Sequence, residues 1–129
     1  MSNIAIRTFV TGDVESLINK LTESLKAIGF GILTRIDFDQ KIKEKLNQDM
    51  PRTVVLGACN PKLAFQAYQQ TKDVALLIPC NIVVRQAGAS RVAIEATRPS
   101  AMFGFLPDLK DKGDVMLIEQ QLESVIANL

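Results

Sequence analysis

The chain has 129 residues, of which 47% are hydrophobic and 22% are charged. This length suits one hydrophobic core, and the apolar content is too high for an intrinsically disordered protein. Fifteen lysines and arginines stand against 14 aspartates and glutamates, so the formal net charge is +1. A balance this even excludes the strongly basic surface of a typical nucleic-acid-binding protein, and we expect a single domain over residues 1–129.

The N-terminal sequence lacks the basic segment followed by an apolar segment that marks a secretion signal. No apolar stretch approaches the roughly 18 residues that a membrane-spanning helix requires. Two cysteines without an export signal are typical of a reducing compartment, so the sequence predicts a cytoplasmic protein with no membrane or nucleic-acid partner. Histidine is absent, which removes His-based triads and most zinc sites. No metal site is predicted, and any cofactor stays unknown.

Two strands and two helices are predicted in the first part of the chain. Alternating apolar residues predict strands over residues 3–10 and 30–37. The helix between them has apolar residues at helical spacing: Val14, Leu17, Ile18, Leu21, Leu25 and Ile28. Gly29 is expected to end this helix. A shorter second helix has an apolar stripe of three residues: Phe38, Ile42 and Leu46. Asp37 and Gln40 have the spacing of a capping box at its start.

A buried strand and a third helix are predicted next. Residues 53–57 form a continuous apolar run, which is the pattern of a strand buried on both faces. Asn60 and Pro61 stand in the favourable order for a helix start, with Asn as the cap and Pro in the first helical position. Residues 73–79 suit either a helical turn or the start of a strand, and Pro79 argues against an uninterrupted central strand.

The last part of the chain predicts a hairpin and a helix. Residues 81–86 and 91–97 flank a short turn that contains glycine. Residues 99–112 are expected to form a loop, whose apolar residues either cover a core edge or contact a second subunit. Asp114 is expected to cap the last helix. The order is β-α-β-α-β-α-β-β-α, which predicts an α+β fold. The short early crossovers suggest parallel strand pairs and the hairpin an antiparallel pair, giving a small mixed β-sheet packed with helices in two layers.

Two Cys-Asn pairs at the ends of predicted core strands are the candidate functional site: Cys59 with Asn60, and Cys80 with Asn81. Cys59 directly precedes the third helix, whose free N–H groups and dipole favour the reactive thiolate. The four residues are therefore candidate ligand-binding residues, and the two cysteines are candidate catalytic groups. Packing competes with this hypothesis, because buried cysteine acts as a small apolar filler and asparagine caps helices or stabilises turns.

The two motifs resemble a known family. Residues 56–61, Leu-Gly-Ala-Cys-Asn-Pro, and residues 76–84, Leu-Leu-Ile-Pro-Cys-Asn-Ile-Val-Val, are similar to shared segments of the family called domain of unknown function 302. Residues 29–33 match a further segment, so the resemblance spans nearly the whole chain. It implies an α+β fold with a small mixed sheet, a homodimer and a function not established. The family's shared residues correspond to Gly57, Cys59, Asn60, Pro61, Pro79, Cys80 and Asn81.

The chain departs from that family pattern at two places. Members often carry an acidic residue where Arg35 stands, and Asp-Pro where this chain has Arg98 and Pro99. Any role of those acids in the family is therefore not expected here.

Two functions remain open from the sequence. The first is a small-ligand-binding or redox-active thiol module that uses Cys59 and Cys80, with Asn60 and Asn81 orienting the ligand. The second is a non-enzymatic homodimeric interaction or sensor domain, which is favoured by the absence of histidine and of a recognisable catalytic constellation. A hydrolase or transferase is a weaker third hypothesis, because a lone thiolate has no visible general base.

Overall fold

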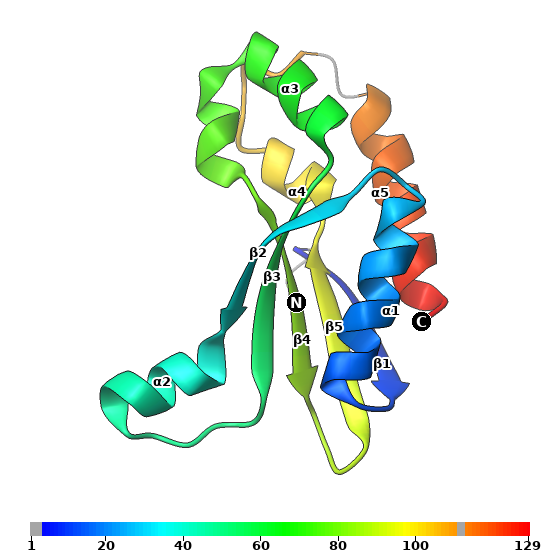
Figure 1. The fold of residues 1–129 in the computed structure, drawn as a ribbon. Helices are drawn as coiled ribbons and strands as arrows, with labels where there is room; N and C mark the ends of the chain where they lie inside the picture. The colour runs from blue at the N-terminus through cyan, green and yellow to red at the C-terminus, as the bar shows by residue number, and fades with distance from the viewer. Residues whose placement is uncertain (1–3, 111–112) are drawn as a thin grey trace.

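A computed structural model describes residues 4–110 and 113–129 of the chain. Five strands form one sheet: β1 (Ala5–Thr11), β2 (Gly31–Asp37), β3 (Thr53–Cys59), β4 (Cys80–Gln86) and β5 (Arg91–Thr97). The helices are α1 (Val14–Lys26), α2 (Phe38–Leu46), α3 (Pro61–Gln70), the 3₁₀ helix η1 (Lys72–Leu77), α4 (Pro99–Phe103) and α5 (Gly113–Ala127). Figure 1 shows their arrangement. The α+β class and the predicted order of strands and main helices are confirmed. No helix of the described residues is long and apolar enough to cross a membrane.

The expected mixed sheet is wrong, because the sheet is antiparallel throughout. Its order is β1-β5-β4-β3-β2, and each neighbouring pair runs antiparallel. A parallel pair needs a connection that crosses the face of the sheet. In Figure 1, α2 and α3 instead leave opposite ends of the sheet, so the chain returns at the end where it left. Helix α1 does make a crossover, but it joins β1 at one edge to β2 at the other.

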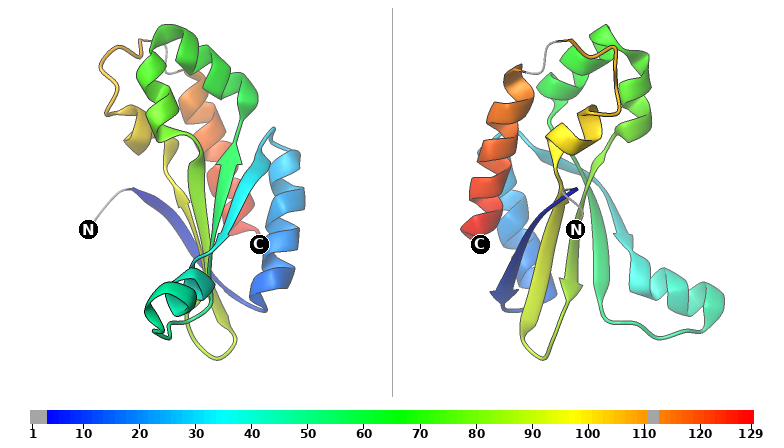
Figure 2. Two further views of the ribbon diagram at one scale, coloured as in Figure 1. Left: turned by 60° about the vertical axis from the view of Figure 1, so that its left-hand side comes forward. Right: turned by 180° about the vertical axis from the view of Figure 1, so that it is seen from behind.

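The main core lies between one face of the sheet and helices α1 and α5, which makes two layers (Figures 1 and 2). Helix α1 buries five of the six residues that its periodicity predicted, and Leu21 and Leu25 are completely buried. The sixth, Ile28, follows the helix and packs against the core only partly buried. The sheet contributes alternate residues of its central strands: Val54, Leu56, Ile82, Val84, Val92 and Ile94. Asp13 caps α1 by accepting a hydrogen bond from the Ser16 N–H at 3.0 Å.

A second apolar cluster closes the upper end of the sheet, as Figure 1 is drawn. It contains residues of α3, η1, α4 and α5 and of the loop before α5: Leu63, Ala67, Val74, Phe103, Leu106, Leu109 and Val115. The predicted loop over residues 99–112 therefore contains a short helix, which sequence reasoning missed, and its residues 111–112 lie outside the described residues. Phe103 and Leu106 cover the core edge, which was one of the two expectations for this segment. Asp114 lies inside the first turn of α5, so its expected capping position is wrong.

Helix α2 extends away from the lower end of the sheet, opposite α1 and α5 in each view of Figures 1 and 2. None of its residues is buried. The expected capping box is wrong, because the Asp37 side chain makes no cap hydrogen bond. Asp37 instead accepts hydrogen bonds from the guanidinium groups of Arg35 and Arg52. These bonds take the place of a cap bond to the helix backbone.

Candidate functional site

The structure brings the two Cys-Asn segments together. Strands β3 and β4 are neighbours, and Ala58 pairs with Cys80 in their register, so Cys59 lies one residue beyond the residue opposite Cys80. The two segments approach each other closely because Gly57 has no side chain. A Cβ atom at this position would lie 2.6 Å from Cγ of Pro79 and would also collide with Oγ1 of Thr34. Gly57 of the first motif therefore makes room for Pro79 of the second.

Asn60 has a structural role at the start of α3. Its Oδ1 atom accepts a hydrogen bond from the Leu63 N–H at 3.1 Å, and Pro61 takes the first helical position. Its amide nitrogen faces Gly29, where φ is +83° and an added Cβ would lie 3.3 Å from that nitrogen. The predicted helix cap is thus confirmed, and it uses the side-chain oxygen that a ligand would otherwise contact.

A small apolar pocket contains both cysteines and Asn60. Its remaining walls come from β3, α3, η1, α4 and from connecting residues: Phe30, Ala58, Leu63, Ala64, Leu77, Ile78, Pro99 and Phe103. The volume is about 20 Å³, which is room for about one water molecule. Both cysteines are free and partly exposed. An organic ligand does not fit this pocket as it stands, since small-molecule sites usually measure about 300–1,000 Å³.

Burial affects the ionisation of both thiols. It raises the pKa of Cys59 above its ordinary value. Burial raises the pKa of Cys80 to about 11, and the negative charge of an ionised Cys59 contributes to this. The two thiols are therefore protonated at neutral pH, and such cysteines react slowly.

Asn81 does not join this pocket. Alternation along β4 places it on the opposite face from Ile82, and it borders a separate hollow at the upper end of the sheet. We call this the upper hollow. Its volume is about 290 Å³, and its lining residues are Leu76, Leu77, Ile78, Pro79, Asn81, Thr97 and Met102. The four predicted site residues are thus divided. Cys59, Asn60 and Cys80 line the small apolar pocket, which we call the thiol pocket, and Asn81 lines the upper hollow.

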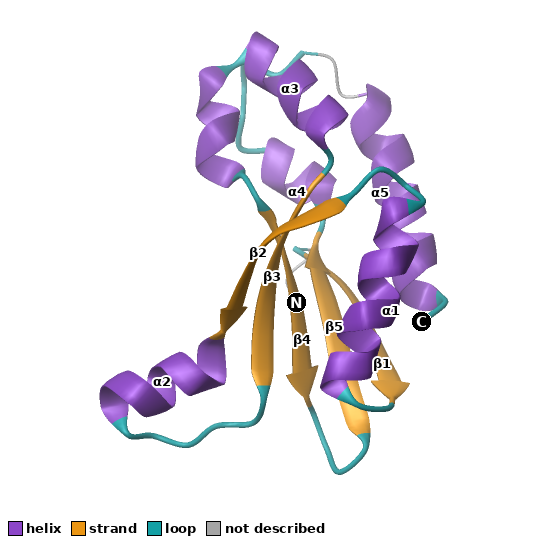
Figure 3. Cartoon of the chain, in the orientation of Figure 1, coloured by secondary structure: helices purple, strands orange, loops and turns teal. Residues whose placement is uncertain are grey.

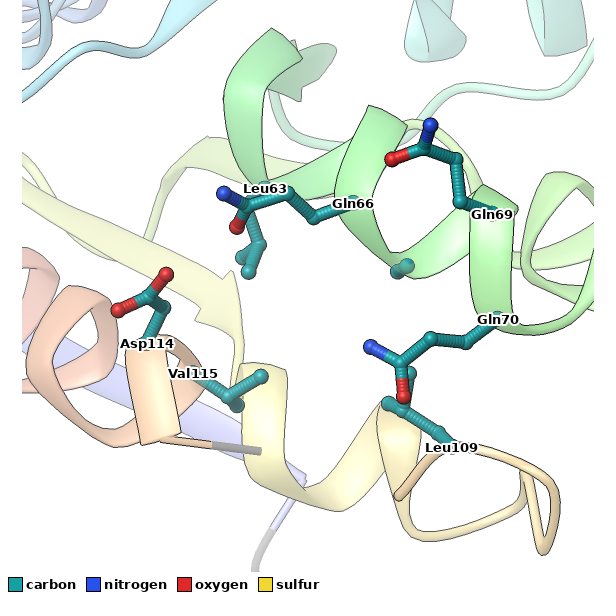
Figure 4. Close-up of a pocket in the computed structure, with 8 residues that line it drawn as sticks. Leu63, Gln66, Gln69, Gln70, Leu109, Asp114 and Val115 are labelled. Carbon is teal, nitrogen blue, oxygen red and sulfur yellow. The ribbon is translucent and has the colours of Figure 1, made fainter. Parts of the chain in front are cut away.

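A larger cavity, of about 430 Å³, lies between α3 and the beginning of α5 (Figure 4). The amide groups of Gln66 and Gln70 and the carboxylate of Asp114 line it together with apolar side chains. The side-chain oxygen Oε1 of Gln70 already accepts a hydrogen bond from the Lys110 backbone N–H at 2.9 Å. Sequence reasoning did not find this cavity, because glutamines on a helix read as solvent-exposed positions. It contains neither cysteine.

No helix in the described part of the chain covers the centre of the sheet face opposite the main core (Figures 2 and 3). We call it the outer face. Alternation and register place the following apolar side chains on it: Phe9, Ile36, Val55, Val83 and Ala93. Phe9 is 45% exposed and Ile36 48% exposed. The sequence did contain a signal for this face, since β3 and β4 have apolar residues at consecutive positions and not only on alternate ones.

A row of three charges crosses the outer face. Glu95 on β5 is paired with Arg7, its register partner on β1, and with Arg85 on β4, which lies two residues beyond its register partner Val83. Burial alone would raise the pKa of Glu95, but hydrogen bonds from Arg85 and Arg7 lower it below its ordinary value. Each charge in the row therefore has a partner within the chain, and none has to be left unpaired when the face is covered.

The fold defines a class of two-layer α+β proteins in which one antiparallel sheet packs against two long helices. A crystal structure of an uncharacterized conserved DUF302 protein from Bacillus stearothermophilus is similar to this chain, with 27% identity, a TM-score of 0.85 and 98% of each chain covered. Residues 6–129 match the family described as domain of unknown function DUF302. No curated protein matches. The chain belongs to the DUF302 family.

Proposed function

We propose that this protein is a homodimeric interaction domain in which two copies pack through their outer faces. The observation that carries the proposal is the one-sided burial of the central strands. Residues 53–57 have the apolar pattern of a strand buried on both faces. Among the described residues, helices α1 and α5 cover the inner face, while Val55 and Val83 on the outer face keep part of their surface exposed. A second copy supplies the missing cover.

The size of the outer face supports this proposal. Five strands spaced about 4.8 Å apart, each about 23 Å long, present a flat footprint of roughly 550 Å² before side-chain relief is counted. A stable interface buries about 800 Å² on each partner. Antiparallel sheets also pack well face to face, at about 10 Å separation. The outer face is therefore close to the size of a stable dimer contact, and its charged row is already neutralised by pairing.

The substitution Val83→Lys tests this proposal by sedimentation over a range of protein concentrations. Lysine at this central position lies beside Glu95 on the same face, so the folded monomer tolerates it. In the dimer the ammonium group would be buried, and we expect the dissociation constant to rise by at least about 100-fold, or about 2.7 kcal/mol. Leu117→Lys on α5, where the leucine is 55% exposed, is the matched control and should leave the dimer intact. An unchanged dimer in Val83→Lys would contradict the proposal.

The thiol pocket favours a second candidate function, a slow redox pair formed by Cys59 and Cys80. The supporting observation is that two cysteines from neighbouring strands line one pocket. With glutathione disulfide as the oxidant, Cys59 would displace one glutathione and form a mixed disulfide. Cys80 would then attack the Cys59 sulfur and release the second glutathione, which leaves one protein disulfide and two glutathione thiols. Asn60 would hold the helix start in place beside the pair.

The substitution Cys80→Ser separates the redox pair from two packing residues. In glutathione disulfide, the variant should accumulate a mixed disulfide at Cys59, because the second attack is removed. The unsubstituted protein should instead lose both thiols together, without a lasting adduct, as read by intact mass after acid quenching. The reciprocal variant Cys59→Ser controls for direct modification of Cys80. If both thiols of the native protein stay reduced, the cysteines only fill the core, and the dimer proposal stands alone.

A further inference from the structure

Helix α2 carries an apolar stripe that the described residues of its own chain do not bury. The stripe consists of three residues at successive helical turns: Phe38, Ile42 and Leu46. Phe38 is 41% exposed and Leu46 62% exposed. Nine residues make a helix roughly 13 Å long. An amphipathic helix of this kind normally packs its apolar stripe against another surface, so α2 has the form of an arm without a docking partner.

The direction of this arm is fixed by an ion-pair cluster at its base. Arg52 contacts Asp39 at 2.8 Å and Asp37 at 2.9 Å, and Asp39 also accepts a hydrogen bond from the Thr53 N–H at 3.0 Å. Arg35 joins Asp37 to Glu15 of α1. These contacts tie the first turn of α2 to β2, β3 and α1. The arm is therefore preorganised, which reduces the entropy cost of docking it.

The upper hollow is the matching surface at the other end of the sheet. It begins where β4 and β5 present Asn81 and Thr97 on the outer face, and it continues over the apolar residues of η1 and α4. Leu76, at its rim, is 83% exposed. The apolar walls suit an apolar helix stripe, and the amide of Asn81 suits the polar edge of such a helix.

We propose that, in the homodimer, α2 of each copy docks in the upper hollow of its partner. This inference rests on the proposed outer-face dimer. In the proposed dimer the two-fold axis lies between the two sheets, parallel to them and perpendicular to the strands, so that the lower end of one sheet faces the upper end of the other. The arm leaves the lower end on the side opposite α1 and α5 (Figure 2). Its length exceeds the roughly 10 Å between packed sheets, so the arm reaches its partner. The arm contact is made twice and enlarges the interface.

The substitution Leu46→Lys tests the arm contact by sedimentation. It should raise the dissociation constant of the dimer by at least about tenfold, because a charge replaces an apolar anchor. Gln40→Lys adds the same charge on the polar side of α2 and is the matched control, with an expected change within about twofold. Circular dichroism spectra should be unchanged in both variants, since neither side chain is buried.

A charge pair then tests the docking place. Leu76→Glu should weaken the dimer alone, and the double variant Leu46→Lys with Leu76→Glu should recover affinity, because each lysine meets a glutamate of the partner. If Val83→Lys weakens the dimer but Leu46→Lys and Leu76→Glu do not, the arm contact is wrong and the outer-face dimer survives. If the unsubstituted protein is a monomer throughout, the dimer proposal itself fails.

Discussion

Replacing Arg98 by methionine should lower the free energy of unfolding by about 3 kcal/mol, since removing one partner of a buried ion pair leaves the other charge uncompensated. Arg98 contacts Glu119 at 3.2 Å, and the side chain of Glu119 is only 5% exposed. Glu119 also accepts a hydrogen bond from the Ser100 N–H at 2.8 Å, which joins α5 to the first turn of α4. Methionine keeps the apolar length of the arginine and removes its charge, so chemical denaturation measures the loss of the ion pairs of Arg98 with little change in packing.

The more exposed ion pair of Arg98, with Glu123, provides the control. Arg98 also contacts Glu123, whose side chain is 46% exposed, so Glu123→Gln should cost less than about 1 kcal/mol. Equal losses in the two variants would contradict the assignment of the stabilisation to Glu119.

The pH dependence of stability gives a second measure of the same contact. Burial alone would raise the pKa of Glu119, but hydrogen bonds from Ser100 and Arg98 outweigh it and lower the pKa. Because its pKa is lower in the folded chain, ionised Glu119 stabilises the fold at pH values above its unfolded pKa of about 4.3. This stabilisation is lost as the pH falls through the folded pKa. The stability of the native chain should therefore fall more steeply below about pH 4.3 than that of Arg98→Met.

Gly57→Ala should destabilise the protein by about 2 kcal/mol, because the new methyl group overpacks a site without space. Thr34 can rotate its hydroxyl away from the added Cβ, but the ring of Pro79, 2.6 Å from it, is rigid. Either β3 moves away from the Pro79 turn or the turn shifts, and in both cases the thiol pocket is distorted. Thermal or chemical denaturation measures the loss.

Gly31→Ala is the matched control for this substitution. It makes the same change in the neighbouring strand β2, and a Cβ there meets no atom within 4 Å. We expect Gly31→Ala to leave stability unchanged or slightly higher, since alanine restricts the unfolded chain. A Gly57→Ala protein as stable as this control would show that the close contact between the two motifs is unimportant.

Local structure was predictable from the sequence where a short-range pattern decides it. The periodicity of α1 predicted its buried side, and Asn60 with Pro61 predicted the start of α3. The hairpin of β4 and β5 was also predicted, as were the positions of all five strands. In each case neighbouring residues in the sequence determine the conformation, through side-chain alternation, helical spacing or a cap.

Strand direction and the roles of surface charges were not predictable in this way. Whether α2 and α3 cross the sheet or leave its ends depends on which strands pair, and that is a long-range property. Asp37 has the spacing of a helix cap, yet Arg52, 15 residues away, binds its carboxylate. The two arginines that depart from the family pattern, Arg35 and Arg98, each pair with carboxylates of distant helices.

The candidate site was found in part. Sequence reasoning placed Cys59 and Cys80 at strand ends, and the register of β3 with β4 brings them to one pocket. It expected an activated thiolate, whereas burial raises the pKa of both cysteines. It grouped Asn81 with them, but successive side chains of a strand point to opposite faces, so Asn81, which follows Cys80, lies on the other face of the sheet. The outer face was signalled only by apolar residues at consecutive positions of β3 and β4.

Hydroxyl-radical footprinting over a range of protein concentrations tests most directly whether a second copy covers the outer face. Phe9 on that face is 45% exposed, and Phe65 on α3 is 63% exposed, so one aromatic residue type serves as both reporter and control. We predict that oxidation of Phe9 falls severalfold as the concentration rises through the dissociation constant, while oxidation of Phe65 stays constant. Oxidation of Phe9 that is independent of concentration, in a protein that sediments as a 14.2 kDa monomer, would contradict the proposed dimer.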